Sequence, residues 1–208
     1  MRIFKPNYEI LDNLDADAIL NKLERIARVC YKSEDKICEG SAERLIRALI
    51  KHEHEAMLEH VSFSVKFTVD RGISHEIVRH RIASFAQEST RYCNYSGEGI
   101  GVIVPSYLDK GSEYRLWASM CEEAEDAYTA LIQSGKTPQE ARAVLPTCLK
   151  TELVMTANLR EWRHFFKLRA LGTTGKLHPQ MVEVAVPLLK EVQALIPVVF
   201  DDLVVKED

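Results

Sequence analysis

The stretch VSFSVKFTVD, residues 61–70, alternates apolar and polar residues without a break. Successive side chains of a strand point to opposite faces of a sheet, so this pattern predicts a strand with one buried face. Asp70-Arg71-Gly72 then reads as a turn, and Ser74 has the chemistry of an N-cap for a short helix that runs to Arg81. The rest of the chain is expected to pack on the sheet that this strand starts.

Helical patterns lie on both sides of the strand. Apolar residues recur at helical spacing from Asp15 to Cys30, and a second helix is expected to begin with Ser41 as its N-cap. Further helices are expected over 112–135, from the Thr137-Pro138-Gln139-Glu140 capping box to Pro146, over 159–171, and over 179–196, where Pro187 is expected to kink the helix. A second strand is expected over 150–157. Residues 1–13 are expected to be extended, and residues 82–111 to form a loop with short extended pieces. This inventory predicts an α+β fold, with helices packed on a small, largely antiparallel β-sheet.

The composition is that of one folded domain spanning residues 1–208. Apolar residues make up 46% of the chain and charged residues 28%, which allows a hydrophobic core. The formal net charge of −4 argues against a protein that coats nucleic acid. The N-terminus has no signal-peptide pattern, and no apolar run has the roughly 20 residues of a membrane span. A cytoplasmic protein that contacts neither nucleic acid nor membrane is expected.

The sulfur and imidazole side chains indicate no metal site. The cysteines are scattered and include no CxxC pair: Cys30, Cys38, Cys93, Cys121 and Cys148. Neither a disulfide framework nor a zinc site is therefore expected. Cys30, Cys121 and Cys148 have apolar surroundings and are expected in the core. His52 and His54 are two positions apart, unlike the paired ligands of an HExxH helix.

Residues 79–92, RHRIASFAQESTRY, form the most unusual run of polar side chains. Guanidinium groups bind phosphates and carboxylates through planar forks and stay charged at any physiological pH. In an acidic chain, such a cluster indicates a pocket for an anionic small molecule. A solvated basic face that makes surface ion pairs has the same composition, so composition alone leaves the two interpretations level.

The spacing in this run resembles the RHR-x7-S signature of flavin-dependent thymidylate synthases. Arg79-His80-Arg81 is followed by seven residues and then by Ser89, with Arg91 two positions later. The resemblance covers most of the chain, through ARVCYKS at 27–33, LEHVSF at 58–63, ARAVLP at 141–146, Asn158-Leu159-Arg160, Leu168-Arg169 and HPQM at 178–181. Ala86-Gln87 departs from the Asn-Glu of many members. The resemblance implies the α+β fold of the thymidylate-synthase-complementing type.

The resemblance also implies two ligands. FAD is expected at Ser62, Arg79, His80, Arg81, Gln87, Asn158, Leu159, Arg160 and His164. The nucleotide dUMP is expected at Glu76, Ile77, Val78, Arg79, Ser89, Thr90, Arg91 and Arg142. Catalytic roles are expected for Ser89, for Arg91 and for Arg169, which would lie against the uracil and favour loss of its N3 proton. In the family these groups come from different subunits of a homotetramer, so each site is expected at a subunit interface.

The implied reaction is reductive methylation of dUMP to dTMP. NADPH reduces FAD, 5,10-methylenetetrahydrofolate gives its methylene to uracil C5, and the reduced flavin supplies the hydride, which leaves tetrahydrofolate. No cysteine has the surroundings of an activated thiolate, and Ser89 has no activating histidine or lysine at a fixed offset. Two rival functions stay open: an enzyme of the same scaffold that leaves a hydroxymethyl group, and a non-enzymatic nucleotide- or RNA-binding module that uses the arginines alone.

Overall fold

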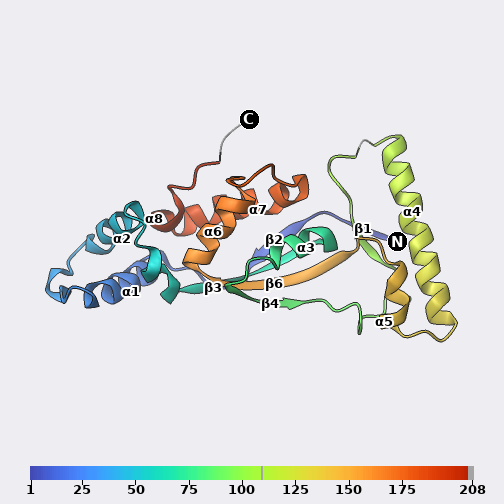
Figure 1. The fold of residues 1–208 in the computed structure, drawn as a ribbon, viewed down its shortest axis with the longest axis horizontal. Helices are drawn as coiled ribbons and strands as arrows, with labels where there is room; N and C mark the ends of the chain where they lie inside the picture. The colour runs from blue at the N-terminus through green and yellow to red at the C-terminus, as the bar shows by residue number, and fades with distance from the viewer. Residues whose placement is uncertain (109, 206–208) are drawn as a thin grey trace. The chain divides into compact units, whose positions relative to one another are not determined.

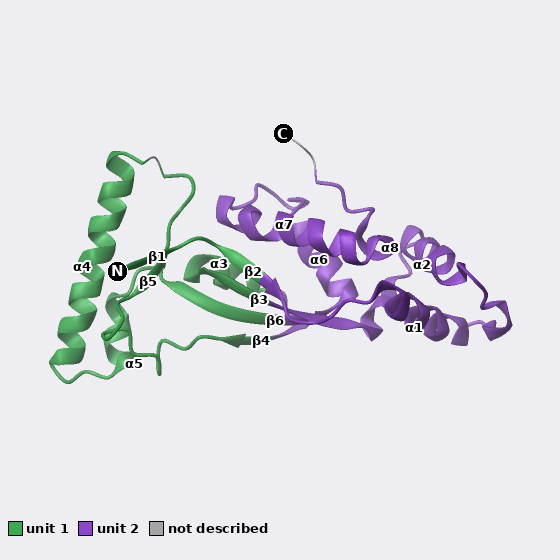
Figure 2. Ribbon diagram, turned by 180° about the vertical axis from the view of Figure 1, so that it is seen from behind, with its two compact units in different colours: residues 1–8, 66–79, 85–154 green, residues 9–65, 80–84, 155–208 purple. Residues whose placement is uncertain are grey.

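The computed structural model describes residues 1–108 and 110–205, which form two compact units (Figure 2). Unit 1 comprises residues 1–8, 66–79 and 85–154, and unit 2 comprises residues 9–65, 80–84 and the described residues from 155 onward. Each unit is assembled from separate stretches of sequence, so no linker in the sequence marks the division. The single domain expected over residues 1–208 stays a prediction.

A four-stranded sheet in the order β2-β3-β6-β4 contributes strand residues to both units (Figure 1). Its strands are β2 (Asn7–Ile10), β3 (Ser62–Asp70), β4 (Ala83–Gln87) and β6 (Lys150–Asn158). Side chains of β3 alternate between buried and more exposed positions, as the period-2 pattern predicted. A two-stranded sheet pairs β1 (Arg2–Phe4) with β5 (Gly101–Ile103) in parallel. The α+β class with a small, largely antiparallel sheet is confirmed, and the parallel pair is its exception.

Helix α3 (Arg71–Ile77) of unit 1 begins earlier than the sequence predicted. Asp70 is its N-cap, because the Asp70 carboxylate accepts the backbone N–H of Ile73 at 2.7 Å. Ser74 lies inside the helix, and its hydroxyl donates to the carbonyl oxygen of Arg71. The predicted short helix after the strand is confirmed, but its bounds, its Ser74 cap and the predicted turn at residues 70–72 are wrong.

The long helix predicted over 112–135 is confirmed as α4 (Ser112–Gln133). The capping box that follows is also confirmed, since the Thr137 backbone N–H donates to the Glu140 carboxylate at 2.9 Å. Helix α5 (Pro138–Ala141) is shorter than predicted, because the chain continues as the 3-10 turn η3 (Arg142–Val144) before Pro146.

Trp162, on α6, is fully buried in the aromatic core of unit 2. The Trp162 ring stacks on Phe63 with centroids 4.7 Å apart, and its indole N–H donates to the Phe63 carbonyl at 3.1 Å. The helices are α1 (Ala16–Val29), α2 (Ser41–Lys51), α6 (Leu159–Arg169), α7 (Pro179–Leu195) and α8 (Pro197–Phe200), with 3-10 turns η1 (Glu34–Lys36) and η2 (Glu55–His60). This contact joins β3 to α6.

Two local predictions in unit 2 need correction. Gly40, in a left-handed conformation, is the N-cap of α2, while the Ser41 hydroxyl donates to the buried Glu24 carboxylate at 2.9 Å instead of capping the helix. Cys30 is exposed, not in the core, because it is the C-cap of α1 and lies beyond the helical positions to which the apolar periodicity applies. Helix α7 runs through Pro187 without ending there.

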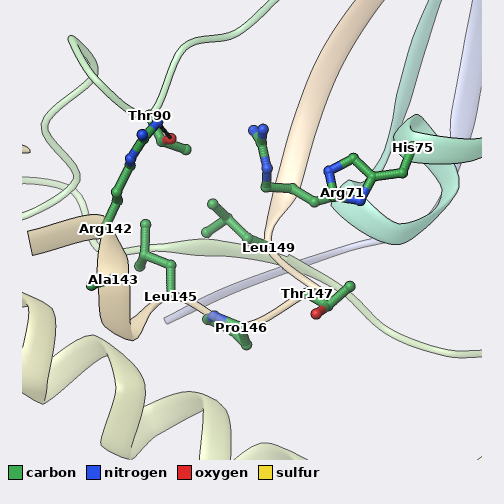
Figure 3. A pocket seen from close by; sticks show the side chains of 9 residues that line it. All are labelled: Arg71, His75, Thr90, Arg142, Ala143, Leu145, Pro146, Thr147 and Leu149. Atoms are coloured by element: carbon green, nitrogen blue, oxygen red, sulfur yellow. Dashed lines mark hydrogen bonds between the residues drawn. The ribbon is translucent and has the colours of Figure 1, made fainter. Parts of the chain in front are cut away.

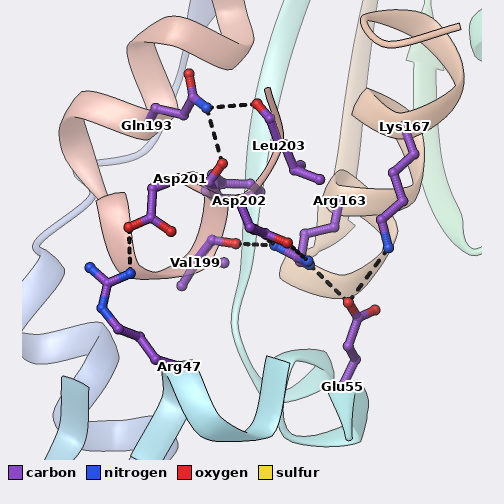
Figure 4. A network of polar contacts seen from close by, with 10 residues as sticks. Arg47, Glu55, Arg163, Lys167, Gln193, Val199, Asp201, Asp202 and Leu203 are labelled. Atoms are coloured by element: carbon purple, nitrogen blue, oxygen red, sulfur yellow. Dashed lines mark hydrogen bonds and ion pairs between the residues drawn. The ribbon is translucent and has the colours of Figure 1, made fainter. Parts of the chain in front are cut away.

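The end of the described chain is held by a network that we refer to as the C-terminal clamp: Arg163, Glu55, Val199 and Asp202 (Figure 4). Arg163 forms two hydrogen bonds with the Asp202 carboxylate, at 2.6 and 2.7 Å, and one with Glu55 at 3.0 Å. It also donates to the carbonyl oxygen of Val199. Burial acts to lower the pKa of Arg163, but the two carboxylates outweigh it and raise that pKa, so the guanidinium stays charged.

No helix of the described residues combines the length and the hydrophobicity that crossing a bilayer requires.

Candidate functional site

A cavity of about 320 Å³ lies within unit 1, and we refer to it as the arginine cavity (Figure 3). Its lining residues are Arg71, His75, Thr90, Arg142, Ala143, Leu145, Pro146, Thr147 and Leu149. They come from α3, from the loop after β4, from η3 and from the segment that leads into β6. None of these described lining residues is acidic, and two of them are arginines, so the cavity carries positive charge and is complementary to an anionic ligand.

Arg142 and Thr90, both expected to bind the nucleotide, meet at this cavity. Arg142 Nη1 donates to Thr90 Oγ1 at 3.2 Å, which joins residues 52 positions apart. The capping box at Thr137 fixes the start of α5, and η3 follows directly, which places Arg142. Thr90 is buried and Arg142 is exposed, so the hydroxyl anchors one nitrogen of a guanidinium that offers further N–H groups to a ligand.

Ser89 and Arg91 lie on either side of Thr90 in the turn after β4. The Ser89 hydroxyl accepts the backbone N–H of Arg91 at 3.3 Å, and Arg91 Nε donates to Gln139 Oε1 at 3.3 Å. The Arg91 guanidinium lies over the Tyr92 ring, 5.4 Å from its centroid. Neither Ser89 nor Arg91 is among the residues that line the cavity in the described structure.

Arg71 is a cavity residue that the sequence reasoning missed. Its Nη1 atom is buried and has no hydrogen-bond partner among the described residues. Its backbone N–H donates to the carbonyl oxygens of Thr147 and Leu149, both at 3.1 Å, which fixes Arg71 against the cavity wall. Buried polar groups ordinarily have partners, so an unmatched guanidinium nitrogen in a cavity without carboxylates is a strong indication of an anionic ligand. The signal in the sequence was Asp70, whose N-cap role starts the helix at Arg71.

His75 also lines the cavity. It lies four positions after Arg71 on α3, and residues at that spacing share one helix face.

Four residues expected to bind dUMP lie at the end of α3 and just after it: Glu76, Ile77, Val78 and Arg79. Ile77 is fully buried, whereas Arg79 is exposed. None of these four described residues lines the arginine cavity.

Gln87, expected to contact the flavin, faces two hydroxyl groups of unit 1. Its amide nitrogen donates to Ser74 Oγ at 2.9 Å and to Thr151 Oγ1 at 3.2 Å. Both hydroxyl-bearing residues are buried, so the orientation of the Gln87 amide is fixed by the protein.

Unit 2 holds a second group of polar side chains, the histidine cluster: His80, Glu161, His164 and Arg169. His80 Nδ1 lies 2.9 Å from Glu161 Oε1, and Arg169 Nε donates to His80 Nε2 at 3.3 Å. An arginine only donates, so Nε2 is the acceptor and Nδ1 carries the proton that Glu161 accepts. This is a neutral imidazole with one defined tautomer.

The surroundings of His80 keep it neutral. Burial is the largest effect and lowers the pKa of His80, and the nearby Arg169 and His164 lower it further. The hydrogen bond and the charge of Glu161 act in the opposite direction without reversing the shift. Glu161, which the sequence reasoning missed, therefore orients His80 and through it Arg169.

The histidine cluster has some geometry of a metal site but not the electrostatics of one. Ligand atoms of His80, Glu161 and His164 lie within 4.8 Å of one another. However, the Arg169 guanidinium donates to His80 Nε2, and a cation bound there would face this positive charge. We assign no metal to the cluster.

The remaining residues expected to bind flavin are in unit 2 and differ in their surroundings. Asn158 caps α6, since its side chain accepts the Glu161 backbone N–H at 2.9 Å. Leu159 is fully buried, and Arg160 is exposed and pairs with Glu59 at 2.5 Å. Two further residues are exposed: Ser62 and Arg81. The structure thus places the expected dUMP residues in unit 1, and the expected flavin residues in unit 2 apart from Arg79 and Gln87.

Comparisons with known proteins agree on one family. A family model described as thymidylate synthase complementing protein matches residues 12–198. A flavin-dependent thymidylate synthase of Geobacter sulfurreducens is 33% identical over 85% of this chain and 78% of its own length. The corresponding protein of Corynebacterium glutamicum is 31% identical over 96% of this chain and 85% of its own length. Among solved structures, a UMP/dUMP methylase, PolB, from Streptomyces cacaoi bound with 5-Br dUMP is similar, with a TM-score of 0.82, 26% identity, and coverage of 97% of this chain and 96% of that one.

Proposed function

This chain belongs to the family of thymidylate synthase complementing proteins, and on that premise we propose that it is a flavin-dependent thymidylate synthase, which methylates dUMP to dTMP. The observation that carries this proposal is the arginine cavity, where guanidinium groups gather without a lining carboxylate. A phosphate monoester is the part of dUMP that complements such a site, because arginine binds phosphate oxygens through paired N–H donors.

In this proposal Arg142 and Arg71 bind the nucleotide phosphate, and Thr90 holds Arg142 in position. Ser89 and Arg91, on the same turn as Thr90, contact the nucleotide beside the phosphate. The Nη1 atom of Arg71, which has no partner among the described residues, gains a phosphate oxygen as its acceptor, and this removes the cost of a buried unsatisfied donor. The remaining expected contacts, Glu76 through Arg79, belong to the same proposal.

The flavin is proposed to be FAD, held by residues of unit 2. The donor set fits this cofactor, because the exposed guanidiniums of Arg81 and Arg160 suit a pyrophosphate, while Ser62, Asn158 and His164 offer further polar contacts. Leu159, which is buried, is limited to a backbone contact. Arg79 and Gln87, which the family resemblance also assigns to the flavin, belong to the same proposal. When bound, the flavin supplies the hydride that the methylation requires.

Arg169 is proposed to stabilise negative charge on the uracil as N3 loses its proton. A fixed positive charge at that position lowers the free energy of the anionic pyrimidine. His80 supports this role because it accepts from Arg169 Nε without carrying a competing charge, and Glu161 sets the His80 tautomer that makes this possible. Because the guanidinium is already oriented, the reaction does not have to include the entropic cost of ordering it.

We further propose NADPH as the reductant and 5,10-methylenetetrahydrofolate as the carbon donor, with tetrahydrofolate as a product, in a cytoplasmic homotetramer with shared active sites. These proposals follow from the family resemblance. Light scattering coupled to size-exclusion chromatography tests the tetramer.

UMP is a second candidate substrate, because the similar PolB structure is that of a methylase of both UMP and dUMP. Both nucleotides carry the phosphate that the arginine cavity complements. Competition between the two at equal concentration separates them, and dUMP is the substrate we expect to be preferred.

The proposed function is tested by an absorption spectrum followed by a coupled assay. Purified protein should show the visible absorption of bound flavin and should oxidise NADPH in a dUMP-dependent reaction when the folate is present. Mass spectrometry should then detect dTMP, whereas a hydroxymethylated nucleotide would support the rival chemistry. A colourless protein that binds RNA with a steep salt dependence would contradict the enzyme altogether.

A further inference from the structure

Two thiols meet in unit 1 behind the wall of the arginine cavity. The sulfur atoms of Cys121, on α4, and Cys148, just before β6, lie 3.5 Å apart although the residues are 27 positions apart in the sequence. Cys121 is buried and Cys148 is partly buried, in a cluster with Ile100, Val102 and Leu149. A disulfide bond is about 2.05 Å long, so the sulfur atoms need to approach by roughly 1.5 Å.

The two thiols differ in reactivity. The hydrogen bond from the Cys121 thiol is the largest effect on Cys148 and lowers the pKa of Cys148 to about 7, against the effect of burial. The Trp117 indole N–H, which is buried and has no hydrogen-bond partner among the described residues, acts on the pKa of Cys148 in the same direction. The same hydrogen bond and burial raise the pKa of Cys121. Cys148 is also the more accessible of the two, because Cys121 is buried and Cys148 is only partly buried, so Cys148 is assigned as the attacking thiolate and Cys121 as the resolving thiol.

We propose that Cys121 and Cys148 form an oxidation site that takes hydrogen peroxide and closes to a disulfide. The Cys148 thiolate attacks one peroxide oxygen, so that an S–O bond forms, the O–O bond breaks and hydroxide leaves to be protonated to water. The Cys121 sulfur then attacks Cys148, so that the S–S bond forms, the S–O bond breaks and the leaving hydroxide takes the Cys121 proton. In total, two thiols lose two electrons and two protons, and the peroxide becomes two waters.

Closure of this disulfide acts on the arginine cavity through the backbone. Cys148 lies between Thr147 and Leu149, which line the cavity and whose carbonyl oxygens both accept the Arg71 backbone N–H. The Cys148 carbonyl is itself held by the N–H of Ile103 at 2.9 Å. Movement of Cys148 toward α4 therefore displaces the hydrogen bonds that position Arg71. This consequence for nucleotide affinity rests on the proposed function, whereas the oxidation site does not.

The test treats the full-length protein with graded hydrogen peroxide. Differential alkylation and peptide mass spectrometry identify which cysteines are linked, and dUMP affinity is measured by calorimetry on the same samples before and after dithiothreitol. Cys121→Ser and Cys121→Ala both remove the resolving thiol but replace it with different side chains. If one variant misfolds, the other can still be tested. Cys38→Ser, which removes an exposed cysteine of unit 2, is the matched control.

We expect a peptide linked through Cys121 and Cys148 as the first oxidation product in the unchanged protein and in Cys38→Ser. The oxidised protein should bind dUMP about tenfold more weakly, a change of about 1.4 kcal/mol, and dithiothreitol should restore the affinity. Oxidation of Cys148 to a sulfinic acid without a linked peptide would overturn the oxidation site. A linked peptide with unchanged dUMP affinity would overturn its connection to the cavity. Reduced protein that binds no dUMP would count against the proposed function, while the linked peptide would still decide the oxidation site.

Discussion

In the C-terminal clamp of unit 2 all three guanidinium nitrogens of Arg163 have protein acceptors, whereas in the arginine cavity of unit 1 the guanidiniums of Arg142 and Arg71 have few. Arg163 donates to Asp202, Glu55 and the Val199 carbonyl. Arg142 donates to Thr90, and Arg71 keeps a buried nitrogen without a partner among the described residues. The side chain is the same in each case. The number of protein acceptors around the guanidinium therefore distinguishes an arginine that stabilises the fold from one that can bind a ligand.

Arg169 differs from both, because its Nε atom donates to the neutral imidazole of His80. A neutral acceptor orients the guanidinium without neutralising its charge. The arginines therefore differ in the groups that hold their guanidiniums, and the comparison predicts a different kind of damage for each substitution.

The largest effect is expected from Arg163→Ala, which leaves Asp202, Glu55 and Val199 without their shared donor. Truncating one side of a buried ion pair costs about 3–5 kcal/mol of stability, and the loss is expected near the lower end of this range because the Asp202 side chain is 44% exposed. Urea denaturation followed by circular dichroism measures this loss. Arg47→Ala is the matched control, because Arg47 pairs with the neighbouring Asp201 at the surface and should cost less than about 1 kcal/mol. Equal losses of stability in Arg163→Ala and Arg47→Ala would show that the buried acceptors of Arg163 do not make it a special structural residue.

The next effect is expected from Arg169→Ala, which should lower turnover about 100- to 1,000-fold, as loss of a transition-state charge partner does. FAD affinity should stay close to that of the unchanged protein, since Arg169 acts on the uracil. Turnover and flavin binding are measured on the same preparation. Lys167→Ala, on the same helix, is the control. Equal loss of turnover and of FAD affinity would contradict this role.

Much of the fold was predictable because its signals are local. The strict alternation over 61–70 gave β3, and the Thr137 capping box gave the start of α5. The start of α3 was mistaken because Asp70-Arg71-Gly72 satisfies both a turn pattern and an N-cap pattern, and only the Asp70 to Ile73 hydrogen bond separates them.

The site was only partly predictable, because its contacts join distant residues. Thr90 and Arg142 were each expected from the family signature, but their hydrogen bond was not. Glu161 was missed since its partner His80 lies 81 positions away, and one sequence carries no signal for such a pair. Arg71 was missed as a direct result of the turn assigned at Asp70.

For Arg142→Ala we expect dUMP to bind about 10- to 100-fold more weakly, in line with the 1.5–3 kcal/mol of a charge-assisted hydrogen bond. Stability should change little, because Arg142 is exposed and has Thr90 as its described side-chain partner. Calorimetric titration with dUMP measures the affinity. Arg115→Ala, an exposed arginine of α4 outside the cavity, should leave it unchanged. A comparable loss in Arg115→Ala would mean that general charge, not the cavity, attracts the nucleotide.

Arg71→Met should separate stability from binding. Removing a buried donor without a described partner is expected to leave the free energy of unfolding unchanged or slightly higher, while dUMP affinity falls about tenfold. Thermal unfolding with and without dUMP gives both quantities. If this variant instead loses stability and keeps its affinity, Arg71 belongs with Arg163 as a structural residue.

The smallest effect concerns His80 and pH. Its pKa in the folded protein is lowered, so the unfolded chain binds the proton more readily and folding is favoured above the ordinary histidine pKa. This contribution is present above about pH 6.5 and is lost as pH falls below it. Unfolding free energies between about pH 5 and 8 should therefore fall more steeply with acid in the unchanged protein than in His80→Gln. Parallel curves would show that His80 does not titrate in this way.

The most direct test of the arginine cavity compares dUMP with deoxyuridine, which lacks the phosphate, in the unchanged protein and in Arg142→Ala. If Arg142 binds the phosphate, dUMP binds far more tightly than deoxyuridine to the unchanged protein, and that ratio falls about 10-fold or more in the variant. The same ratio in both proteins would contradict the account, because Arg142 would then act on some other part of the nucleotide or on none.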